Sequence, residues 1–278
     1  MIAPINNIIP FSNVDGPGNR TSIFFQGCPF QCLYCHNPET INICNNCGVC
    51  VDHCPVNALE FINDKVVWNK KKCISCDTCI KVCPHLSSPK ITYMSVDQVF
   101  EEILKYRQFI KGITTSGGEC MVYADFLTEL FEKCVNIGLD CLLDSNGHYD
   151  FKKYEKLLKY SSGVMLDVKA MDKDFHRYVT KMPNENVINN LLYLQSINKL
   201  FEVRTVVLPN NKEHNENTIN KLSEILNSDI SVKLIKYRPF GVRKEGIDKI
   251  GNSITSDEEV NRLFNIAKSK GLKNVVII

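Results

Sequence analysis

Three cysteines near the start of the chain have the spacing C-x3-C-x2-C: Cys28, Cys32 and Cys35. The surrounding stretch, "GCPFQCLYCHNPE", holds no fourth cysteine. A closed tetrahedral metal site has four protein ligands, whereas a catalytic site leaves one position for water or substrate. Unless the spacing is accidental, it therefore indicates a metal site with one open position.

Two further cysteine runs follow, and they have the same pattern as each other. Residues 44–54 read "CNNCGVCVDHC" before Pro55, and residues 73–83 read "CISCDTCIKVC" before Pro84. Each is C-x2-C-x2-C-x3-C-P, which resembles the run that binds [4Fe–4S] clusters in bacterial ferredoxins. Paired C-x2-C motifs also suit zinc, so two zinc knuckles are the alternative. Zinc binding would require neither two identical four-cysteine runs nor a proline after each run.

The resemblance to two-cluster ferredoxins also implies a ligand assignment, because in those proteins the fourth cysteine of each run reaches the other cluster. One cluster is expected on Cys44, Cys47, Cys50 and Cys83, and the other on Cys73, Cys76, Cys79 and Cys54. The segment between the runs, "ALEFINDKVVWN", predicts a small hairpin with its turn at Asn63-Asp64. Residues 41–90 are therefore expected to form an inserted ferredoxin-like domain.

The remaining cysteines and the composition bound the class of protein. Eleven of the 14 cysteines lie between Cys28 and Cys83; Cys120, Cys134 and Cys141 are expected to pack in the core. This distribution is typical of metal ligands in a reducing compartment rather than of disulfides. The net charge of +2 is too small to indicate a nucleic-acid-binding protein. Without a signal-peptide pattern or a long apolar run, the sequence predicts a cytoplasmic protein with no membrane partner.

Outside the insert, strands and helices alternate. The predicted strands are 21–27, 112–116, 139–145, 163–169, 201–209, 232–238 and 273–278. The predicted helices are 122–136, 150–159, 172–198, 216–227, 256–270 and one from Ser95, with Gln98 in capping-box position, to about Phe109. The β-branched strand sequences suggest helices on both faces of a parallel sheet. We predict an α/β fold, a partial (β/α)6 barrel of residues 1–40 and 91–278, interrupted by residues 41–90.

Polar residues fall where these strands end, and chemistry in such barrels sits at the carboxyl ends of the strands. Each could be ordinary loop polarity, but their coincidence at one end of one barrel favours a site. They are Cys28 after the first strand, "SGGE" (116–119) after the second, "DSNG" (144–147) at the third, "DVK" (167–169) at the fourth, and Arg204 and Arg238 in the fifth and sixth.

With these residues in place, the chain resembles a known enzyme family. C-x3-C-x2-C after a first strand is the signature of radical S-adenosylmethionine (SAM) enzymes. "DGPGNR" (15–20) and "CHNPE" (35–39) resemble the activating enzymes of glycyl radical enzymes, and the resemblance covers essentially the whole chain. "KVVWN", "CDTC", "GITTSGGE" and "DSNG" are most similar to the YjjW-type glycine radical enzyme activases.

The resemblance implies a function and its cofactors. Cys28, Cys32 and Cys35 would hold a third [4Fe–4S] cluster, and SAM would take the open position. Reductive cleavage of SAM would give methionine and a 5′-deoxyadenosyl radical, which abstracts hydrogen from a backbone glycine of a partner glycyl radical enzyme. An external ferredoxin or flavodoxin would supply the electron. The cofactor supplies the hard chemistry and the protein positions it.

The resemblance also implies roles for individual residues. Adenine contacts are expected at Tyr34 and His36; SAM contacts at Gly117, Gly118, Glu119, Asp167, Lys169 and Arg204; and a monovalent cation near Asp144, Ser145, Met165 and Asp167. Asp15 is expected to join the catalytic site by facing the partner's glycine loop. Arg238, also expected at the cofactor, stands where pyruvate formate-lyase activase has a histidine.

Two other functions fit parts of the sequence. An electron-carrying ferredoxin fused to a barrel explains eight cysteines but leaves Cys28, Cys32 and Cys35 unused. A radical SAM enzyme acting on another peptide or small molecule, of the maturase type, explains all eleven, although "DGPGNR" and "CHNPE" speak against it. Whether the insert conducts electrons or docks the partner stays open.

Overall fold

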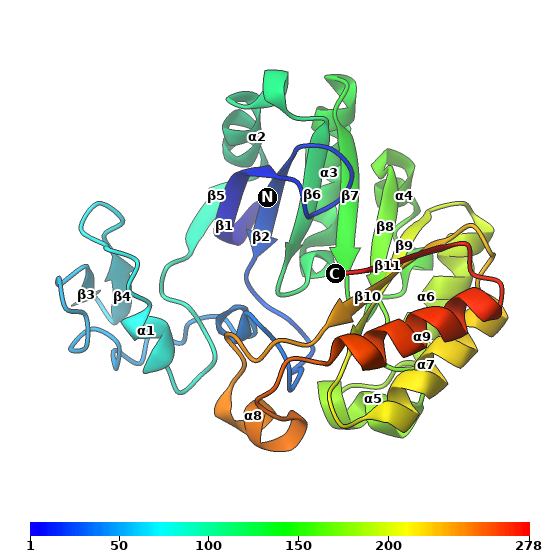
Figure 1. Cartoon of the computed structure of the whole chain (residues 1–278). Coiled ribbons are helices and arrows are strands. Elements are labelled where there is room, and N and C mark those ends of the chain that lie inside the picture. The colour runs from blue at the N-terminus through cyan, green and yellow to red at the C-terminus, as the bar shows by residue number, and fades with distance from the viewer.

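A computed structural model describes all 278 residues and shows one large mixed sheet with helices beside it and a small unit projecting from it (Figure 1). The elements of the main sheet and its helices are β1 (Ile2–Ser12), β2 (Arg20–Phe25), β5 (Thr92–Ser95), α2 (Val96–Leu104), β6 (Gly112–Gly117), α3 (Ala124–Asn136), β7 (Asp140–Ser145), α4 (Glu155–Tyr160), β8 (Gly163–Asp167), α5 (Lys173–Thr180), α6 (Glu185–Ser196), β9 (Leu200–Val207), α7 (Lys212–Ile225), β10 (Ser231–Lys236), α8 (Lys244–Ile250), α9 (Asp257–Ser269) and β11 (Asn274–Ile277). Short 3-10 turns are η1 (Pro38–Thr40), η2 (Arg107–Phe109), η3 (Cys120–Tyr123) and η4 (Phe151–Lys153).

The sheet has nine strands in the order β11-β10-β9-β8-β7-β6-β2-β1-β5. Seven strands, from β2 to β11 in that order, are parallel, so the alternating α/β prediction is confirmed. The two edges, β11 and β5, are not paired, and the barrel is therefore partial. β1 and β5 were not predicted; they extend the sheet beside β2 in antiparallel pairs. β1 is hard to recognise from the sequence because it contains Pro4 and Pro10, and proline is unusual inside strands. Its pairing with β2 also has register shifts.

The hydrophobic core lies on one face of the sheet. It combines strand residues such as Ile113, Leu143 and Val203 with helix residues such as Leu127 and Leu222. The opposite face carries several polar side chains, with Leu142 and Met165 in register between them: Ser22, Thr114, Asp144, Glu202, Arg204 and Lys233. The expectation of helices packed on both faces is therefore wrong. On this inward face, oppositely charged side chains form ion pairs with one another, close to the carboxyl ends of the strands.

Helix boundaries largely follow the sequence signals. The predicted capping box is present, since Ser95 accepts from Gln98 N and the Gln98 side chain accepts from Ser95 N. α2 ends at Leu104 rather than at Phe109, with η2 covering the remainder. α8 was not predicted. No helix in this structure has the length and apolar character needed to cross a membrane.

The projecting unit contains β3 (Leu59–Ile62), β4 (Lys65–Trp68) and α1 (Thr78–Lys81) (Figure 1). β3 and β4 form the predicted hairpin, and its turn residues Asn63 and Asp64 have φ of 48° and 59°, as a type I′ turn requires. At its base, Asn42 pairs with Ser87, and Asn42 N donates to Leu86 O at 3.0 Å. The unit is thus joined to the sheet by two adjacent chain segments.

The two cysteine runs in this unit fold alike. Residues 44–57 correspond to residues 73–86 position by position, and the exposure of the four cysteines matches in the two runs. Positive φ, which is unusual outside glycine, also recurs at matching positions: Asn46 and Ser75 (60° and 56°), Gly48 and Asp77 (80° and 58°), Asn57 and Leu86 (49° and 50°). The unit is therefore an internal repeat in structure as well as in sequence.

Candidate functional site

A cavity of about 270 Å³ opens at the carboxyl ends of the parallel strands. Most of the predicted site residues line it together: Cys28, Cys32, Cys35, Tyr34, His36, Gly117, Gly118, Glu119, Asp144, Asp167, Lys169 and Arg204. They come from the loop after β2 and from the ends of β6, β7, β8 and β9, which the parallel order of the sheet brings to one edge.

The three cysteines at the cavity are free thiols. Burial raises the pKa of Cys32 to about 12, and burial and the neighbouring Cys32 raise the pKa of Cys28. Asn146 Nδ2 donates to Cys28 Sγ at 3.5 Å. No three His, Cys, Asp or Glu side chains gather closely enough for a single ion. A [4Fe–4S] cluster needs no such convergence, because each cysteine binds a different iron, and three free thiols on one cavity wall fit it.

The loop that carries these cysteines is held from three directions. Cys28 N donates to Ile41 O at 2.8 Å, and Leu33 N donates to Val179 O, beside α5, at 2.8 Å. From the N-terminus of α8, Arg243 Nη2 reaches Gln31 O and Cys32 O at 3.3 and 3.4 Å. The loop is thus held by backbone hydrogen bonds and by the Arg243 side chain, without a cofactor.

Glu119 is a fully buried carboxyl group in the cavity wall. Its oxygens accept from Asn146 N at 2.7 Å, Ser145 Oγ at 2.8 Å and Met121 N at 3.0 Å. Burial nevertheless raises its pKa to about 7, although these hydrogen bonds act in the opposite direction. A carboxyl group that titrates near neutral pH in a cavity is a candidate for binding a cationic ligand.

A chain of charges runs along the inward face below the cavity. Arg204 contacts Asp144 at 3.1 Å and Glu202 at 2.8 Å, and Glu202 contacts Lys233 at 3.1 Å. Ser116 Oγ donates to Asp144 at 2.9 Å. Burial raises the pKa of Asp144, and Arg204 opposes that effect. Paired in this way, the charges can stay buried.

Asp167, Lys169 and Tyr34 form a second polar group in the lining of the cavity. Lys169 Nζ contacts Asp167 Oδ2 at 2.6 Å and lies 6.0 Å from the centre of the Tyr34 ring. The Tyr34 hydroxyl is buried and has no hydrogen-bond partner. An orphaned buried hydroxyl costs free energy, so this atom marks a place where a polar ligand group would fit.

The two cavity glycines are also required by the fold itself. A Cβ at Gly118 would lie 2.3 Å from Gly27 O and 2.7 Å from Thr40 O. A Cβ at Gly117, where φ is 115°, would lie 2.3 Å from the Phe25 backbone. Close backbone packing against β2 and the cysteine loop is therefore the direct reason for these glycines, alongside any approach of a ligand.

Four of the residues predicted at the catalytic and cofactor site do not line the cavity: Asp15, Ser145, Met165 and Arg238. Ser145 instead holds Glu119, and Arg238 offers its backbone oxygen to His36 Nε2 at 2.9 Å. Asp15 lies in the loop before β2, at the opposite ends of the strands, where it accepts from Ser12 and Ser22 at 2.6 Å. Arg238 lies beyond the end of β10.

The residues expected near a monovalent cation are paired within the protein. Asp144 already faces Arg204, and Asp167 already faces Lys169. Met165 Sδ accepts from Arg204 Nη2 at 2.9 Å. The protein's own cations thus occupy the neighbourhood of both carboxylates.

Three residues of the site were not predicted from the sequence: Asn146, Glu202 and Arg243. Asn146 lies in the "DSNG" motif, and its side-chain amide donates to Cys28 Sγ. Glu202 lies two residues before Arg204 on the same face of β9, and period-2 spacing could have identified it. No sequence pattern points to Arg243, because the residues that it contacts, Gln31 and Cys32, are far from it in the sequence.

In the projecting unit, a second cavity gathers four cysteines. Its lining includes Cys54, Cys73, Cys76 and Cys79, and its volume is about 20 Å³. These are the four residues that the crossed ligation pattern assigns to one cluster. Ala58 N donates to Cys54 Sγ at 3.2 Å, which is the kind of backbone contact that cluster sulfurs receive.

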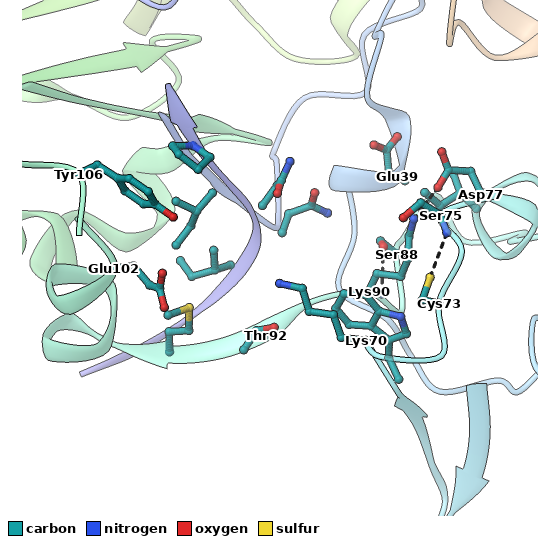
Figure 2. Close-up of a pocket in the computed structure, with 18 residues that line it drawn as sticks. Glu39, Lys70, Cys73, Ser75, Asp77, Ser88, Lys90, Thr92, Glu102 and Tyr106 are labelled. Atoms are coloured by element: carbon teal, nitrogen blue, oxygen red, sulfur yellow. Dashed lines mark hydrogen bonds and ion pairs between the residues drawn. The ribbon is translucent and has the colours of Figure 1, made fainter. Parts of the chain in front are cut away.

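A cavity of about 760 Å³ forms the groove between this unit and the β1–β5–α2 side of the sheet (Figure 2). Lys70, Cys73 and Lys90 line one wall, and Glu102 and Tyr106 line the other (Figure 2). Glu39, in η1, also lines the groove. The groove therefore separates the two units immediately beside the chain segment that joins them.

Comparisons with known proteins agree with this site. Residues 22–222 match the family model of the radical SAM superfamily. The chain is 32% identical over 245 residues to the (2S)-3-sulfopropanediol dehydratase activating enzyme of Klebsiella oxytoca, covering 80% of this chain and 77% of that one. It is 30% identical over 268 residues to the 4-hydroxyphenylacetate decarboxylase activating enzyme of Clostridium scatologenes, covering 86% and 84%.

Among solved structures, QueE from Escherichia coli matches with a TM-score of 0.58 at 13% identity, over 100% of this chain and 94% of that one. At that identity the likeness concerns the fold alone. Taken with the three free cysteines at the carboxyl ends of a parallel sheet, the sequence matches assign the family. The chain belongs to the radical SAM superfamily and, within it, to the activating enzymes of glycyl radical enzymes.

Proposed function

We propose that this chain activates a glycyl radical enzyme by using SAM to remove hydrogen from one backbone glycine of that partner. The observation that carries the proposal is the cavity in which three free cysteines face Glu119, Asp167 and Lys169. Its relatives are named as activating enzymes of different partners, a dehydratase and a decarboxylase, so the partner's own reaction is not assigned.

Each group in the cavity has a task in this proposal. Cys28, Cys32 and Cys35 hold a [4Fe–4S] cluster, which when bound supplies the electron that breaks the sulfonium C–S bond of SAM. The ionised Glu119 attracts the positively charged groups of SAM, and Lys169 attracts its carboxylate. Tyr34 and His36, which line the same cavity, would contact the adenine. Arg204, with Asp144, keeps the cavity floor charged and rigid.

We further propose that residues 41–90 form a ferredoxin-like unit with two [4Fe–4S] clusters, which brings the total to three. The support is the repeated backbone conformation and the cavity shared by Cys54, Cys73, Cys76 and Cys79. A ferredoxin or flavodoxin would be the electron donor. Eleven free cysteines that serve as ligands suit a reducing compartment such as the cytoplasm.

The first experiment measures iron and SAM cleavage after anaerobic reconstitution. Three clusters would give about twelve irons per chain, and the Cys28→Ala/Cys32→Ala/Cys35→Ala variant should lose about four of them. That variant should form no 5′-deoxyadenosine. Unchanged iron content in the variant would overturn the assignment of the site.

The second experiment distinguishes an activase from a maturase-type radical SAM enzyme, because both would form 5′-deoxyadenosine. A candidate glycyl radical enzyme is mixed with the reduced protein and SAM, and the glycyl radical is recorded by electron paramagnetic resonance (EPR). A partner encoded beside this chain is the first choice. SAM cleavage that yields a modified peptide, and no glycyl radical on any such partner, would favour the maturase.

A further inference from the structure

The two halves of the insert carry opposite charge, although their backbones repeat. Residues 41–64 contain no lysine or arginine, and their charged groups are the carboxylates of Asp52, Glu60 and Asp64. Residues 65–90 contain a single carboxylate, that of Asp77, which is paired with Lys90. The lysines of this second half are Lys65, Lys70, Lys71, Lys72, Lys81 and Lys90. The repeat is therefore asymmetric in charge, and its second half is strongly positive.

Three of these lysines directly precede the second cysteine run, in the sequence "NKKKC" (69–73). In the register of the repeat, residues 70–72 correspond to residues 41–43, "INI". The earlier segment attaches the insert, since Ile41 O accepts from Cys28 N at 2.8 Å and Asn42 O accepts from Gln26 Nε2 at 2.7 Å. Residues 70–72 are exposed instead. The same position of the repeat thus serves attachment in the first half and presents three positive charges to solvent in the second.

The backbone of the lysine segment is held in a defined turn. Asn69 Oδ1 accepts from Lys71 N at 3.1 Å and from Lys72 N at 3.2 Å. Of the three lysines, only Lys72 has an ion pair, with the exposed Glu60 at 3.3 Å. Exposed pairs of this kind contribute little free energy. The positive charges of the segment, above all those of Lys70 and Lys71, are therefore available to a partner.

The lysine segment adjoins the cysteines assigned to one cluster. Lys70 and Cys73 lie on the same wall of the groove between the insert and the sheet (Figure 2). Ile74 follows Cys73 and is 62% exposed, whereas the first run has Asn45 at this position. Cys76 is also exposed. An exposed apolar side chain next to charged ones has the composition of a small interface, which is apolar at its centre and polar at its rim.

A negatively charged electron carrier fits this surface. The proposed reaction consumes an electron for each SAM that is cleaved, so a reductant must meet the chain repeatedly and leave again. Complementary charge raises the rate of such encounters without a large interface, and electron-transfer complexes are among the smallest specific ones. The glycyl radical enzyme must instead bring its glycine to the site cavity, and none of the three lysines lines that cavity.

We propose that residues 70–74 form the docking surface for an acidic one-electron carrier protein, which reduces the cluster that Cys73 and Cys76 help to bind. An electron moves from the carrier to the cluster, so the carrier is oxidised, the cluster is reduced, and no bond forms or breaks at the surface. Electrons then enter through the second half of the insert and leave through the first, whose residues 41–43 contact the site loop. The inference rests on the function and the two-cluster assignment proposed above.

The test uses the reconstituted full chain and a flavodoxin of net negative charge. Lys70→Glu/Lys71→Glu/Lys72→Glu reverses the charge of the surface, and Lys70→Gln/Lys71→Gln/Lys72→Gln only removes it. Binding of the oxidised flavodoxin is measured by calorimetry. Formation of 5′-deoxyadenosine is measured with the reduced flavodoxin and, separately, with photoreduced 5-deazariboflavin, which is an uncharged reductant.

The glutamate variant should bind flavodoxin about 10-fold more weakly or worse and should show a raised KM for it. Its rate with deazariboflavin should equal that of the wild type. The glutamine variant should show a smaller effect in the same direction, and wild-type binding should weaken as salt screens the charges. Lys153→Glu/Lys156→Glu/Lys273→Glu makes the same change in net charge at exposed positions outside the insert, and this control should bind like the wild type.

Three other outcomes would overturn the inference, and they can be told apart. Flavodoxin binding and KM that are unchanged in both lysine variants, at wild-type iron content, would remove the docking surface. Lost binding of the glycyl radical enzyme, with flavodoxin binding unchanged, would assign the surface to that partner instead. A wild-type chain that holds its iron but forms no 5′-deoxyadenosine with deazariboflavin would overturn the proposed function, and this inference with it.

Discussion

Glu119 shows how a single residue can couple the site to pH. Its carboxyl group is fully buried and titrates near neutral pH, while the backbone of Asn146 and the hydroxyl of Ser145 donate to it. SAM carries an ammonium and a sulfonium group, which an ionised carboxylate attracts and a neutral one does not. The raised pKa therefore places the charge change inside the physiological range.

SAM binding should tighten as pH rises through about 7, because Glu119 is neutral below its pKa of about 7 and ionised above it. Glu119→Gln should remove this dependence. It should also weaken binding at pH 8 by about 10-fold or more, the equivalent of a lost charge-assisted hydrogen bond of about 1.5–3 kcal/mol. Calorimetry or equilibrium dialysis across pH 6–8 measures both effects. A wild-type affinity that does not vary with pH would contradict this role.

Gly118 is a residue whose replacement should damage more than ligand binding. A Cβ there would press on Gly27 O and Thr40 O, so Gly118→Ala should displace the cysteine loop. We expect lower iron content at the three-cysteine site as well as weaker SAM binding. Gly138→Ala is the control: its φ of 81° brings backbone strain, but a Cβ there meets no atom within 4 Å. Full iron content with only SAM binding lost would show that the glycine serves the ligand alone.

At the scale of elements, the sequence predicted what is local and missed what depends on distant partners. The parallel strands, the Ser95 capping box and the Asn63-Asp64 turn follow from short patterns, and the structure has all three. β1 was missed because Pro4 and Pro10 conceal it. The polar inward face was missed because the many β-branched residues in these strands obscure the alternation of polar and apolar positions. The pairing of Arg204 with Asp144 could not be predicted, because it requires that β9 and β7 contribute side chains to the same face of the sheet.

The same limit applies to the candidate site. Its cysteines, glycines and carboxylates were predicted from motifs, and the parallel sheet brings most of them to one cavity. Asp15 belongs to a loop before a strand, and it therefore lies at the other end of the sheet from the residues that follow strands. Contacts made by α8 could not be predicted, because more than 200 residues separate Arg243 from Gln31 and Cys32.

α8 should act as a clamp on the cysteine loop. Arg243→Ala removes two long hydrogen bonds to the carbonyls of Gln31 and Cys32, a loss of about 1 kcal/mol. Iron at the three-cysteine site should then be lost about 5-fold faster to a chelator, while the insert iron is lost at the wild-type rate. Lys249→Ala, on the exposed side of the same helix, loses only its pair with Glu245 and is the control. Equal rates for the two variants would contradict the clamp.

At the scale of the whole molecule, the first of the two segments that join the insert to the sheet also contacts the site. Cys28 N donates to Ile41 O, and Asn42 pairs with Ser87 at the base of the insert. Gln26 Nε2 also donates to the backbone oxygens of Glu39 and Asn42, at 2.6 and 2.7 Å. The insert is therefore attached directly to the backbone that carries the first site cysteine. This attachment suits a path for electrons, and it equally suits a rigid platform for a partner.

The two roles can be separated by removing one insert cluster. In a Cys73→Ala/Cys76→Ala/Cys79→Ala variant, the sheet and the three-cysteine site keep all of their own contacts, because none of these residues lines the site cavity. A strong chemical reductant should then still support SAM cleavage. A ferredoxin or flavodoxin should fail to support it if the insert conducts electrons, because cluster potentials and the spacing between clusters set the path.

The platform gives the opposite result in the same variant. SAM cleavage would proceed equally with the chemical reductant and the protein donor, and binding of the glycyl radical enzyme would be lost. Circular dichroism and the iron content of the three-cysteine site confirm that the variant is folded. The insert lies across a groove from the sheet and contacts the segment after β2 through Asn42, whose backbone oxygen accepts from Gln26. A conducting insert should therefore need both of its clusters but no contact with the partner. We expect the protein donor to fail and partner binding to persist.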